Sequence, residues 1–568
     1  MADPIVHSGE QTCAAYHPAR RARWRYVLPL AIYLVGLTHQ INEPWVGMHD
    51  WNGAFFSQLA RNFLRYPWEI HHGMPIVAVG EAVPPPAERS IYATHPPGLV
   101  WLVALAFRLF GEHEWAARLV PITASVASLG LLMFLVGRRW GGESALVTGL
   151  IYAAMPMSVY YGRMVNHEAV CLFGMLAMSA AWAVVTEPGT GSASRRWAIA
   201  AFVAALFGLV WVDWSGGLFA GLFVLYVVIK RRRGVVRTWC PAFALVTTVV
   251  AIASMMIYLV HAGLGGRGGD LIAIFASRAA RPDHPLTSDA WEYVPENLSW
   301  AVVVLGAVGV LMAVSRSRHS AVEGEGSPVD RGGQTAAGGT PGPQRMPART
   351  PGCGDQTAGL GVLAVTGLIW LVVFWRQFSI HGYWAFYLGP IVAWLASRSL
   401  LGLRDFLARR WRVVAATGLV YLLLVGVMAG EMRSVLSLYT ACWYGGESEM
   451  QAWQEIHRRT QPDDRVLLFD DPIRIERHGG YEFRNLAPPQ MAYYLDRAFD
   501  VERNFREVPS RAAEHACYVI PIVHAGTTAA ELEPLRARFR VDQIRTKLVF
   551  DLGSAATSRS PLTDPIGP

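Results

Sequence analysis

The sequence has few charged residues and few cysteines. Both shortages reduce the number of protein classes to which it could belong. Charged residues make up 16% of its 568 positions, whereas hydrophobic residues make up 52%. The 21 tryptophans and the positive mean hydropathy are also unusual for a soluble enzyme of this length. The composition therefore predicts a polytopic membrane protein.

The cysteines and the soluble-like regions lack the motifs of common enzyme classes. The six cysteines form no CxxC pair and have no zinc-site spacing, so they indicate neither a redox motif nor a structural metal site. Only Cys442 and Cys517 could pair with each other. The region 431–568 contains no P-loop, no nucleophile elbow and no other catalytic signature.

The formal net charge of +7 would suggest nucleic acid or an acidic partner in a soluble protein. Here the basic residues lie in short clusters between apolar segments, which is typical of signals that set membrane topology. We therefore expect no nucleic-acid partner, and we expect membrane lipids around the chain.

Membrane spans can be placed by asking for about 20 mostly apolar residues each and for basic clusters on one side. This predicts a mainly α-helical protein with about eleven spans, residues 1–25 in the cytoplasm, and the C-terminus outside. No small-residue cleavage site follows the first span, which indicates an uncleaved anchor. The predicted spans are 26–41, 116–137, 144–161, 168–185, 197–212, 215–229, 239–261, 298–314, 359–375, 383–398 and 412–430.

Three other segments complete the predicted domain organisation. Residues 98–110 are too short for a span and are predicted to form a helix on the outer membrane surface. Within the transmembrane domain 26–430, the Gly- and Pro-rich segment 315–359 is typical of a disordered cytoplasmic linker. Residues 431–568 are predicted to form a small outer α/β domain, because helical and strand-like patterns alternate there.

Two acidic residues begin predicted helices on the outer face. Asp50 precedes a stretch whose apolar positions recur at helical spacing, as expected for an amphipathic helix on the membrane surface. Glu168 opens the span 168–185 at the end of "GRMVNHE". Taken singly, each carboxylate is also typical of a residue that stabilises a helix N-terminus. Asp213, in "VWVDWSGG", is more typical of a turn than of a third acid at the site.

Four motifs in order make the chain resemble the membrane glycosyltransferases that use polyprenyl-phosphate sugars. This C-type superfamily includes protein O-mannosyltransferases and the lipid A aminoarabinose transferases. The motifs are Asp50 in the first outer loop, "ATHPPGLVWLVALAFRLFGEHEWAARLVP" at 93–121, "MPMSVYYGRMVNHE" at 155–168 and "FSIHGYWAFYLGPIVAWLA" at 378–396. The chain departs from the family pattern in three ways: Glu168 where aspartate is common, a longer first loop, and the insertion 315–359.

The resemblance implies an integral-membrane enzyme of the bacterial plasma membrane whose active face is extracytoplasmic. It would move a hexosyl or pentosyl group from a polyprenyl-phosphate donor to an extracytoplasmic glycan, lipid or protein acceptor. Since the lipid phosphate is already a good leaving group, such an enzyme must activate the acceptor and hold the departing phosphate.

The resemblance and this chemistry give each outer polar residue a predicted role. Asp50 is predicted to be the general base, and Glu168 a second acid that orients the acceptor or helps to hold a metal ion. The residues predicted to bind the donor phosphate or lipid are Arg163, Arg376, His381 and Tyr383. Those predicted to bind the acceptor or support the site are His49, His95 and His167.

Several alternatives stay open at this point. The three histidines and two acids could hold a divalent cation, although no spacing such as HExxH supports one, so neither a metal nor another cofactor is assigned. Snorkelling to lipid headgroups would explain Arg163 and Arg376 equally well. A transporter or flippase of lipid-linked glycans is a second functional class, and a noncatalytic membrane scaffold is a third.

Overall fold

The computed structural model describes residues 24–553 of the chain with short internal gaps. The predicted cytoplasmic segment 1–25 lies almost wholly outside the described residues, as do Arg376, His381 and Cys442 and nearly all of the linker 315–359. The gaps are 87–89, 93, 188, 233–235, 261–297, 300, 312–357, 375–381, 441–445, 470–472, 479–480, 487–488 and 523–528.

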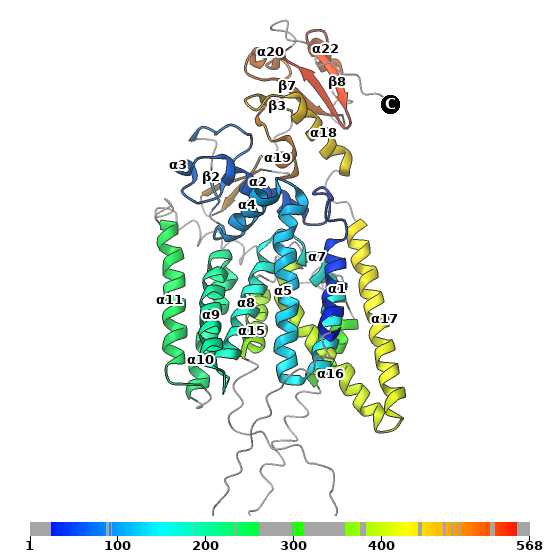
Figure 1. The fold of residues 1–568 in the computed structure, drawn as a ribbon. Coiled ribbons are helices and arrows are strands. Elements are labelled where there is room, and N and C mark those ends of the chain that lie inside the picture. Colours follow the sequence, from blue (N-terminus) through cyan, green and yellow to red (C-terminus); the bar gives the residue numbers. More distant parts are fainter. Residues whose placement is uncertain are drawn as a thin grey trace, which may run out of the picture.

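A bundle of roughly parallel and antiparallel helices makes up the larger part of the molecule (Figure 1). These helices form because their segments are long and apolar, so that each one satisfies its own backbone hydrogen bonds in a lipid environment. In chain order they are α1 (Trp24–Thr38), α5 (Glu114–Trp140), α6 (Gly142–Ala154), α7 (Pro156–Gly162), α8 (His167–Val185), α9 (Ser192–Val212), α10 (Trp214–Arg232), α11 (Cys240–Leu259), α15 (Ala358–Val373), the 3-10 helix η5 (Gly382–Leu388), α16 (Gly389–Ala408) and α17 (Val413–Thr440).

The apolar helices follow the spans predicted from the sequence. Within the described residues, seven helices are long and apolar enough to cross a membrane, and α6 and α7 add one bent pair. Shorter apolar helices occupy the remaining predicted spans, at Arg25–Thr38, Ala301–Leu311 and Gly359–Val373. The mainly α-helical membrane fold is therefore confirmed.

The predicted span 144–161 differs from the expectation because it is broken in the middle. The helices α6 and α7 meet at an angle of 63° at Met155, and Pro156 is the first residue of α7. Proline cannot donate a backbone hydrogen bond and disfavours a helical conformation in the residue before it. The break therefore turns the end of this segment, "PMSVYYG", across the bundle towards the first outer loop, where Tyr160 donates a hydrogen bond to the Met48 carbonyl.

A layer of short elements covers one end of the bundle. It contains α2 (Asp50–Arg65), α3 (Trp68–His71), α4 (Gly98–Phe110) and the paired strands β1 (Ile76–Val77) and β2 (Ser90–Ile91). The helix α4 packs on α2 and leaves Leu105 and Leu109 exposed on its other side, as suits a helix at a membrane surface. The amphipathic helix α2 was predicted to lie on the surface, but side chains of its polar face, including Gln58, Arg61 and Asn62, are buried.

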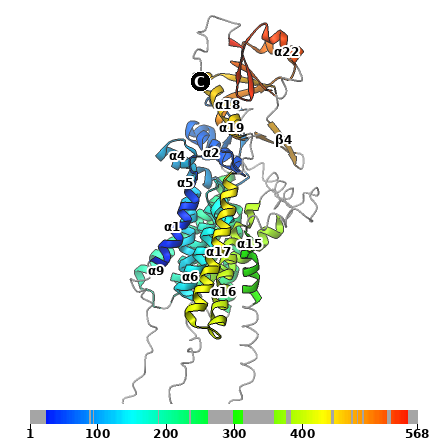
Figure 2. The same cartoon turned by 90° about the vertical axis from the view of Figure 1, so that its right-hand side faces the viewer.

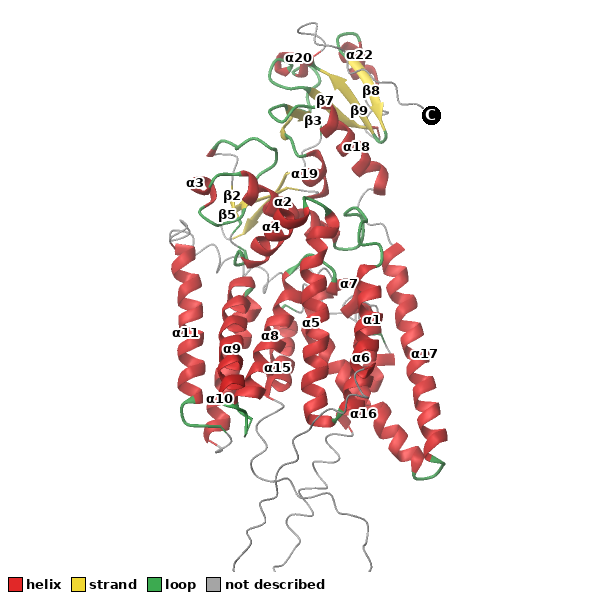
Figure 3. Ribbon diagram, in the orientation of Figure 1, coloured by secondary structure: helices red, strands yellow, loops and turns green. Residues whose placement is uncertain are grey.

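The C-terminal part is a small α/β unit above this layer (Figure 3). Its five-stranded sheet has the order β6-β3-β7-β9-β8, with β6, β3 and β7 parallel and β9 antiparallel to both neighbours. The sheet strands are β3 (Arg465–Leu468), β6 (Ala498–Val501), β7 (Cys517–Pro521), β8 (Arg540–Ile544) and β9 (Lys547–Asp551), and a separate hairpin is made by β4 (Ile473–His478) and β5 (Tyr481–Leu486). The helices are α18 (Gly446–Arg459), α19 (Pro489–Leu495), α20 (Val508–Arg511) and α22 (Ala529–Arg536). Cys517 is a buried free thiol, and Cys442, with which it could pair, lies outside the described residues.

The C-terminal unit shares a hydrophobic core with the layer beneath it. Side chains alternate along β3, so that Leu467 enters a core on the outer side of the sheet, while Val466 and Leu468 face the other side. This second side is continuous with α18, α19, α2 and α4. In the turned view, α18 and α19 lie directly over α2 and α4 (Figure 2). The C-terminal unit is therefore packed onto the same end of the bundle as the predicted outer residues.

Candidate active site

Asp50 is the first residue of α2, but it does not cap that helix. Its neighbour His49 has a left-handed backbone (φ 61°), and α2 has no side-chain hydrogen bond at its N-cap. Instead, Asp50 Oδ2 accepts a hydrogen bond of 2.8 Å from the Gly47 amide and lies 3.5 Å from Arg118 Nη2. Both contacts use Oδ2, so Oδ1 has no hydrogen-bond partner within the described part of the chain. One carboxylate oxygen is therefore held in place, while the other makes no hydrogen bond to the described residues.

Arg118, in α5, is the buried cation that organises the loop before Asp50. Its side chain is 1% exposed, and Nη1 donates to the carbonyls of Ile41, at 2.9 Å, and Glu43. Its guanidinium also lies 4.2 Å from the centre of the Trp45 ring. An arginine buried in this way needs several partners to offset its lost hydration, and here the loop supplies them. Arg118, a residue of the helix bundle, therefore fixes the position of the loop that carries Asp50.

Arg163, in the turn between α7 and α8, belongs to the same charged cluster. It is buried, donates to the His39 carbonyl, lies 3.9 Å from Glu43 and stacks at 4.2 Å over the Tyr439 ring. Burial raises the pKa of the Glu43 carboxyl, and the charges of Arg163 and Arg118 oppose that rise. Arg163 therefore connects the first outer loop to α17 and does not snorkel outwards.

Glu168 lies in a second polar cluster, at the start of α8. Its side chain is buried, and Oε2 has no hydrogen-bond partner among the described residues. The nearby Asp213 accepts a hydrogen bond of 2.6 Å from His95 Nδ1 through Oδ1 and one of 2.5 Å from the Ser215 hydroxyl through Oδ2. Glu168 follows His167 at the start of α8, and the His167 ring stacks on His95, the partner of Asp213.

Histidine rings complete this second cluster. The rings of His95 and His167 are stacked, with centres 4.2 Å apart and planes 19° from parallel. The Phe56 ring of α2 meets His167 edge-on at 4.9 Å. Ser215 also shares a 2.8 Å hydrogen bond with Tyr387 of η5. In the sequence, Asp213 is more typical of a turn than of a third acid. It does form the turn, because the Gly216 amide donates to its carbonyl, but its carboxylate also pairs with His95.

Tyr383 and His49 lie next to the first cluster. The Tyr383 ring meets His49 edge-on at 5.2 Å and lies 5.9 Å from the Tyr161 ring. Burial lowers the pKa of His49 to about 4, so this imidazole is neutral near pH 7. The predicted donor residue Tyr383 and the predicted supporting residue His49 are therefore brought together beside Asp50.

The structure groups the predicted residues into two neighbouring clusters. Asp50 and Arg163 share one with Arg118 and Glu43, and Glu168, His95 and His167 share the other with Asp213. Helix α2 connects them, because its first turn carries Asp50 while Phe56 packs on His167. Among the described residues no hydrogen bond or ion pair joins Asp50 to Glu168, so the predicted action of these two acids in one site stays a prediction.

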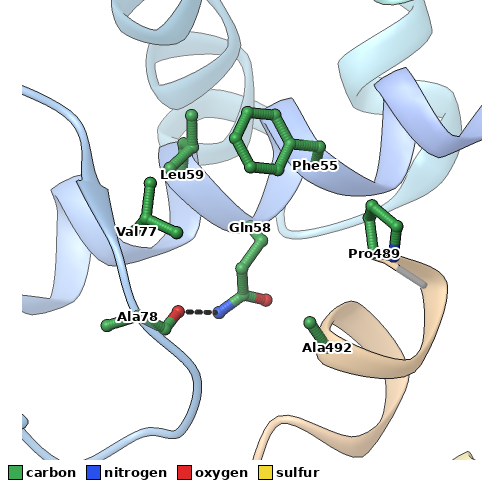
Figure 4. Close-up of a pocket in the computed structure, with 7 residues that line it drawn as sticks. All are labelled: Phe55, Gln58, Leu59, Val77, Ala78, Pro489 and Ala492. Atoms are coloured by element: carbon green, nitrogen blue, oxygen red, sulfur yellow. Dashed lines mark hydrogen bonds between the residues drawn. The ribbon is translucent and has the colours of Figure 1, made fainter. Parts of the chain in front are cut away.

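A small pocket lies farther along α2, between this helix and α19 (Figure 4). Its lining is mostly apolar, and Gln58 Nε2 donates across it to the Ala78 carbonyl at 3.5 Å. The lining residues are Phe55, Gln58, Leu59, Val77, Ala78, Pro489 and Ala492. The pocket therefore joins the first outer loop to the C-terminal unit.

The described residues do not fit the divalent cation that the histidines and acids suggested. Within the ranges that the structure describes, no group of three or more His, Cys, Asp or Glu side chains could hold a metal ion. His95 is engaged by Asp213, and Asp50 lies in the other cluster. We therefore assign no step to a metal.

Comparison with known sequences supports the resemblance drawn from the motifs. A family model described as dolichyl-phosphate-mannose-protein mannosyltransferase matches residues 94–258, a range that includes His95, Glu168 and Asp213. YycA of Bacillus subtilis, a protein named as a mannosyltransferase, is 28% identical over 139 residues. That match covers 24% of this chain and 19% of YycA, so it spans only about a fifth of the relative.

Comparison with solved structures confirms the fold. ArnT from Cupriavidus metallidurans, solved with undecaprenyl phosphate, aligns with a TM-score of 0.55 at 14% identity over 96% of this chain and 99% of its own. The oligosaccharyltransferase AglB from Archaeoglobus fulgidus, solved with an inhibitory peptide and a dolichol-phosphate, aligns with a TM-score of 0.55 at 10% identity over 95% of this chain and 75% of its own. That archaeal enzyme has also been solved with zinc and sulfate. This chain therefore has the fold shared by ArnT and AglB.

Proposed function

We propose that this chain, which has the fold of ArnT and AglB and a mannosyltransferase family match, is an integral-membrane glycosyltransferase. It moves a hexosyl or pentosyl group from a polyprenyl-phosphate donor to an extracytoplasmic glycan, lipid or protein. The observation that carries this proposal is the Asp50 carboxylate. One of its oxygens is fixed by Gly47 and Arg118, and its side chain is 13% exposed at the end of the bundle where the other predicted residues gather.

Asp50 acts as the general base in this proposal. A donor sugar on a lipid phosphate already has a good leaving group, so the step that needs help is the activation of the acceptor hydroxyl or amine. A carboxylate held through Oδ2 can accept the acceptor's proton at Oδ1 without first giving up a helix-capping bond. Proton transfer requires hydrogen-bond reach between the base and the acceptor, and a fixed α2 N-terminus supplies that geometry.

Cationic and polar groups at the same end of the bundle hold the donor's phosphate. Arg163 lies beside Glu43 in the first outer loop, Tyr383 contacts His49, the neighbour of Asp50, and Arg376 and His381 precede Tyr383 in the sequence. Electrostatic stabilisation of a departing phosphate is strongest where water is scarce and the charges are already oriented. Glu168, with His95 and His167, orients the acceptor from the second cluster.

The proposal includes an orientation and a division of the chain. The chain lies in a bacterial plasma membrane with residues 1–25 and 315–359 in the cytoplasm, and Asp50 and the C-terminal unit outside. The transmembrane domain 26–430 performs the transfer, and the region 431–568 selects the acceptor. Its packing on α2, which carries Asp50, supports this division.

A transfer assay tests the function directly. The purified chain in detergent is given a panel of radiolabelled polyprenyl-phosphate sugars and, as acceptor, an envelope fraction from a strain that lacks the chain. We expect label to reach the acceptor from at least one lipid donor, but not from the same sugars carried on nucleotide diphosphates. No transfer from any lipid donor would contradict the proposal, and movement of the intact donor across liposomes would favour a transporter.

A further inference from the structure

A tyrosine of the C-terminal unit reaches into the loop that carries Asp50. Tyr494, at the end of α19, accepts a 2.9 Å hydrogen bond from the Trp45 amide and donates one of 3.0 Å to Glu114 at the start of α5. Tyr494 is 449 positions from Trp45 and 380 positions from Glu114 in the sequence. The hydroxyl therefore connects the C-terminal unit, the first outer loop and the helix bundle.

Trp45 is enclosed on several sides. Its side chain is among the largest that are fully buried, and Tyr493 meets its ring edge-on at 6.4 Å. Gly53 of α2 lies directly against the ring, and a β-carbon there would overlap the ring atoms. The Arg118 guanidinium lies 4.2 Å from the ring centre, a distance at which a cation is attracted to an indole. The position of Trp45 therefore depends on the hydrogen bond between its amide and Tyr494 and on the space that Gly53 leaves for its ring.

Arg118 connects the Trp45 ring to Asp50. The same guanidinium that contacts the Trp45 ring donates to the carbonyls of Ile41 and Glu43 and lies 3.5 Å from Asp50 Oδ2. A shift of Trp45 would remove one of the partners that orient this buried cation. A displacement of about 1 Å in a reacting group can cost about a hundredfold in rate, so small shifts here matter.

We propose that Tyr494 is a positioning residue: through Trp45 and Arg118, the C-terminal unit sets the place of the Asp50 carboxylate. This inference rests on the proposed function, and it gives the C-terminal unit a role in the transfer step itself, in addition to acceptor selection. Tyr494 touches no reacting atom, and its contribution is the geometry of residues 41–50.

Two variants, called the path variants, disturb the series of contacts from Tyr494 through Trp45 and Arg118 to Asp50, and each acts on a different side of Trp45. Tyr494→Phe removes only the hydroxyl, whereas Gly53→Ala pushes on the Trp45 ring from α2. The matched control is Glu81→Gln, because Glu81 also ties the first outer loop to the C-terminal unit, through a 2.6 Å contact with Arg497, but makes no contact with Trp45. All three are made in the full chain, and melting temperatures identify any variant that fails to fold.

The readouts are hydrogen exchange in residues 41–50 and transfer kinetics from a polyprenyl-phosphate sugar to the envelope fraction. We expect faster exchange in both path variants and turnover lower by roughly threefold to tenfold, the range for one buried hydrogen bond, with donor KM unchanged. Glu81→Gln should keep turnover within about twofold of wild type, as for a partly exposed ion pair. Unchanged exchange in Tyr494→Phe, or an equal fall in Glu81→Gln, would overturn the inference. A wild type that is inactive with every donor would overturn the proposed function. The exchange data would still test whether Tyr494 positions residues 41–50.

Discussion

Asp50 combines three properties that a general base at a membrane surface needs. It is fixed through one oxygen, it faces a buried cation, and it retains partial exposure. A capping carboxylate would accept hydrogen bonds from the first amides of α2, and the N-cap of this helix has no such side-chain bond. The local geometry therefore favours a chemical role for Asp50 over a capping role.

His49 gives the same segment a dependence on pH. Burial lowers its pKa to about 4 from an ordinary value of 6.5, so the folded chain holds the neutral ring while the unfolded chain takes up a proton below about pH 6.5. The free energy of unfolding should therefore fall as the pH drops from about 6.5 to 4, by at most about 3 kcal/mol from this residue.

His49→Asn removes that titration, and asparagine tolerates the left-handed backbone at this position. Melting temperatures in detergent at pH 7 and pH 4.5 should fall less between the two values for the variant than for the wild type. The same drop in both proteins would show that the fold does not lower the pKa of His49.

At the residue scale, the sequence reveals groups that are exceptional in their own segment. Asp50 and Glu168 can be found because each is an acid beside an apolar run, and each lies in a polar cluster of the structure. Arg118 and Glu43 were given no role, because their partners come from other segments and single-chain spacing does not reveal such pairs. From the sequence, Asp213 is more typical of a turn than of a third acid, since its partner His95 is 118 residues away and the spacing does not reveal the pair.

At the element scale, α2 is the helix on which the site depends. Its apolar face packs on α4, and its polar face packs on α19 and not on water. Arg61 shows how that polar face is satisfied: it contacts Glu112 at 2.8 Å, the Tyr493 carbonyl at 2.8 Å and the Tyr493 ring at 4.1 Å. Buried polar groups matched in this way specify one docked arrangement of the C-terminal unit.

Arg61→Ala should loosen the C-terminal unit from α2. The change removes the buried guanidinium that bonds the Tyr493 carbonyl and pairs with the buried Asp496 carboxylate. Because Arg65 still contacts Asp496, the cost should lie below the roughly 3–5 kcal/mol of a fully broken buried ion pair. We expect a lower melting temperature and faster release of a C-terminal fragment in limited proteolysis.

Arg65→Ala is the matched control for Arg61. Arg65 contacts the same two carboxylates, Glu112 and Asp496, but its side chain is 25% exposed. Since partly exposed pairs contribute about 1 kcal/mol or less, its effect should be much smaller. Equal fragment release from both variants would show that burial of Arg61 is not what holds the unit.

The spans were predictable as elements because length and hydropathy alone specify a helix in lipid. The alternating helical and strand-like patterns of residues 431–568 also form helices and strands, including β3, β7 and β9. The burial of α2 was not predictable, since an amphipathic pattern looks the same whether its polar face meets water or another folded unit. The bend at Pro156 could have been predicted, because proline inside a helical pattern ends or kinks it.

At the scale of the whole molecule, loops distant in sequence meet at one end of the bundle. The first outer loop, the α7–α8 turn, the α9–α10 turn and η5 are joined there by Asp50–Arg118, Glu43–Arg163, His95–Asp213 and Ser215–Tyr387 contacts. The C-terminal unit lies on the same end (Figure 1). The contacts therefore gather these turns at one end of the bundle, and the side of the membrane that this end faces stays a prediction.

We expect that end to face away from the cytoplasm. In intact cells, a membrane-impermeant thiol reagent should label Glu69→Cys, an exposed position at the site end, more than the wild type. Ser194→Cys, exposed at the start of α9, should be labelled only after the cells are lysed. The opposite pattern would invert the proposed orientation.

The most direct test of the account is the turnover of Asp50→Asn in the lipid-donor transfer assay. Asparagine keeps the size of the side chain and loses the base, so turnover should fall about a hundredfold or more, while binding of the polyprenyl-phosphate sugar and the melting temperature stay near wild type. Glu69→Gln is the control, because Glu69 is an exposed acid in the first turn of α3 and should leave turnover unchanged. Near-wild-type turnover in correctly folded Asp50→Asn would contradict the account.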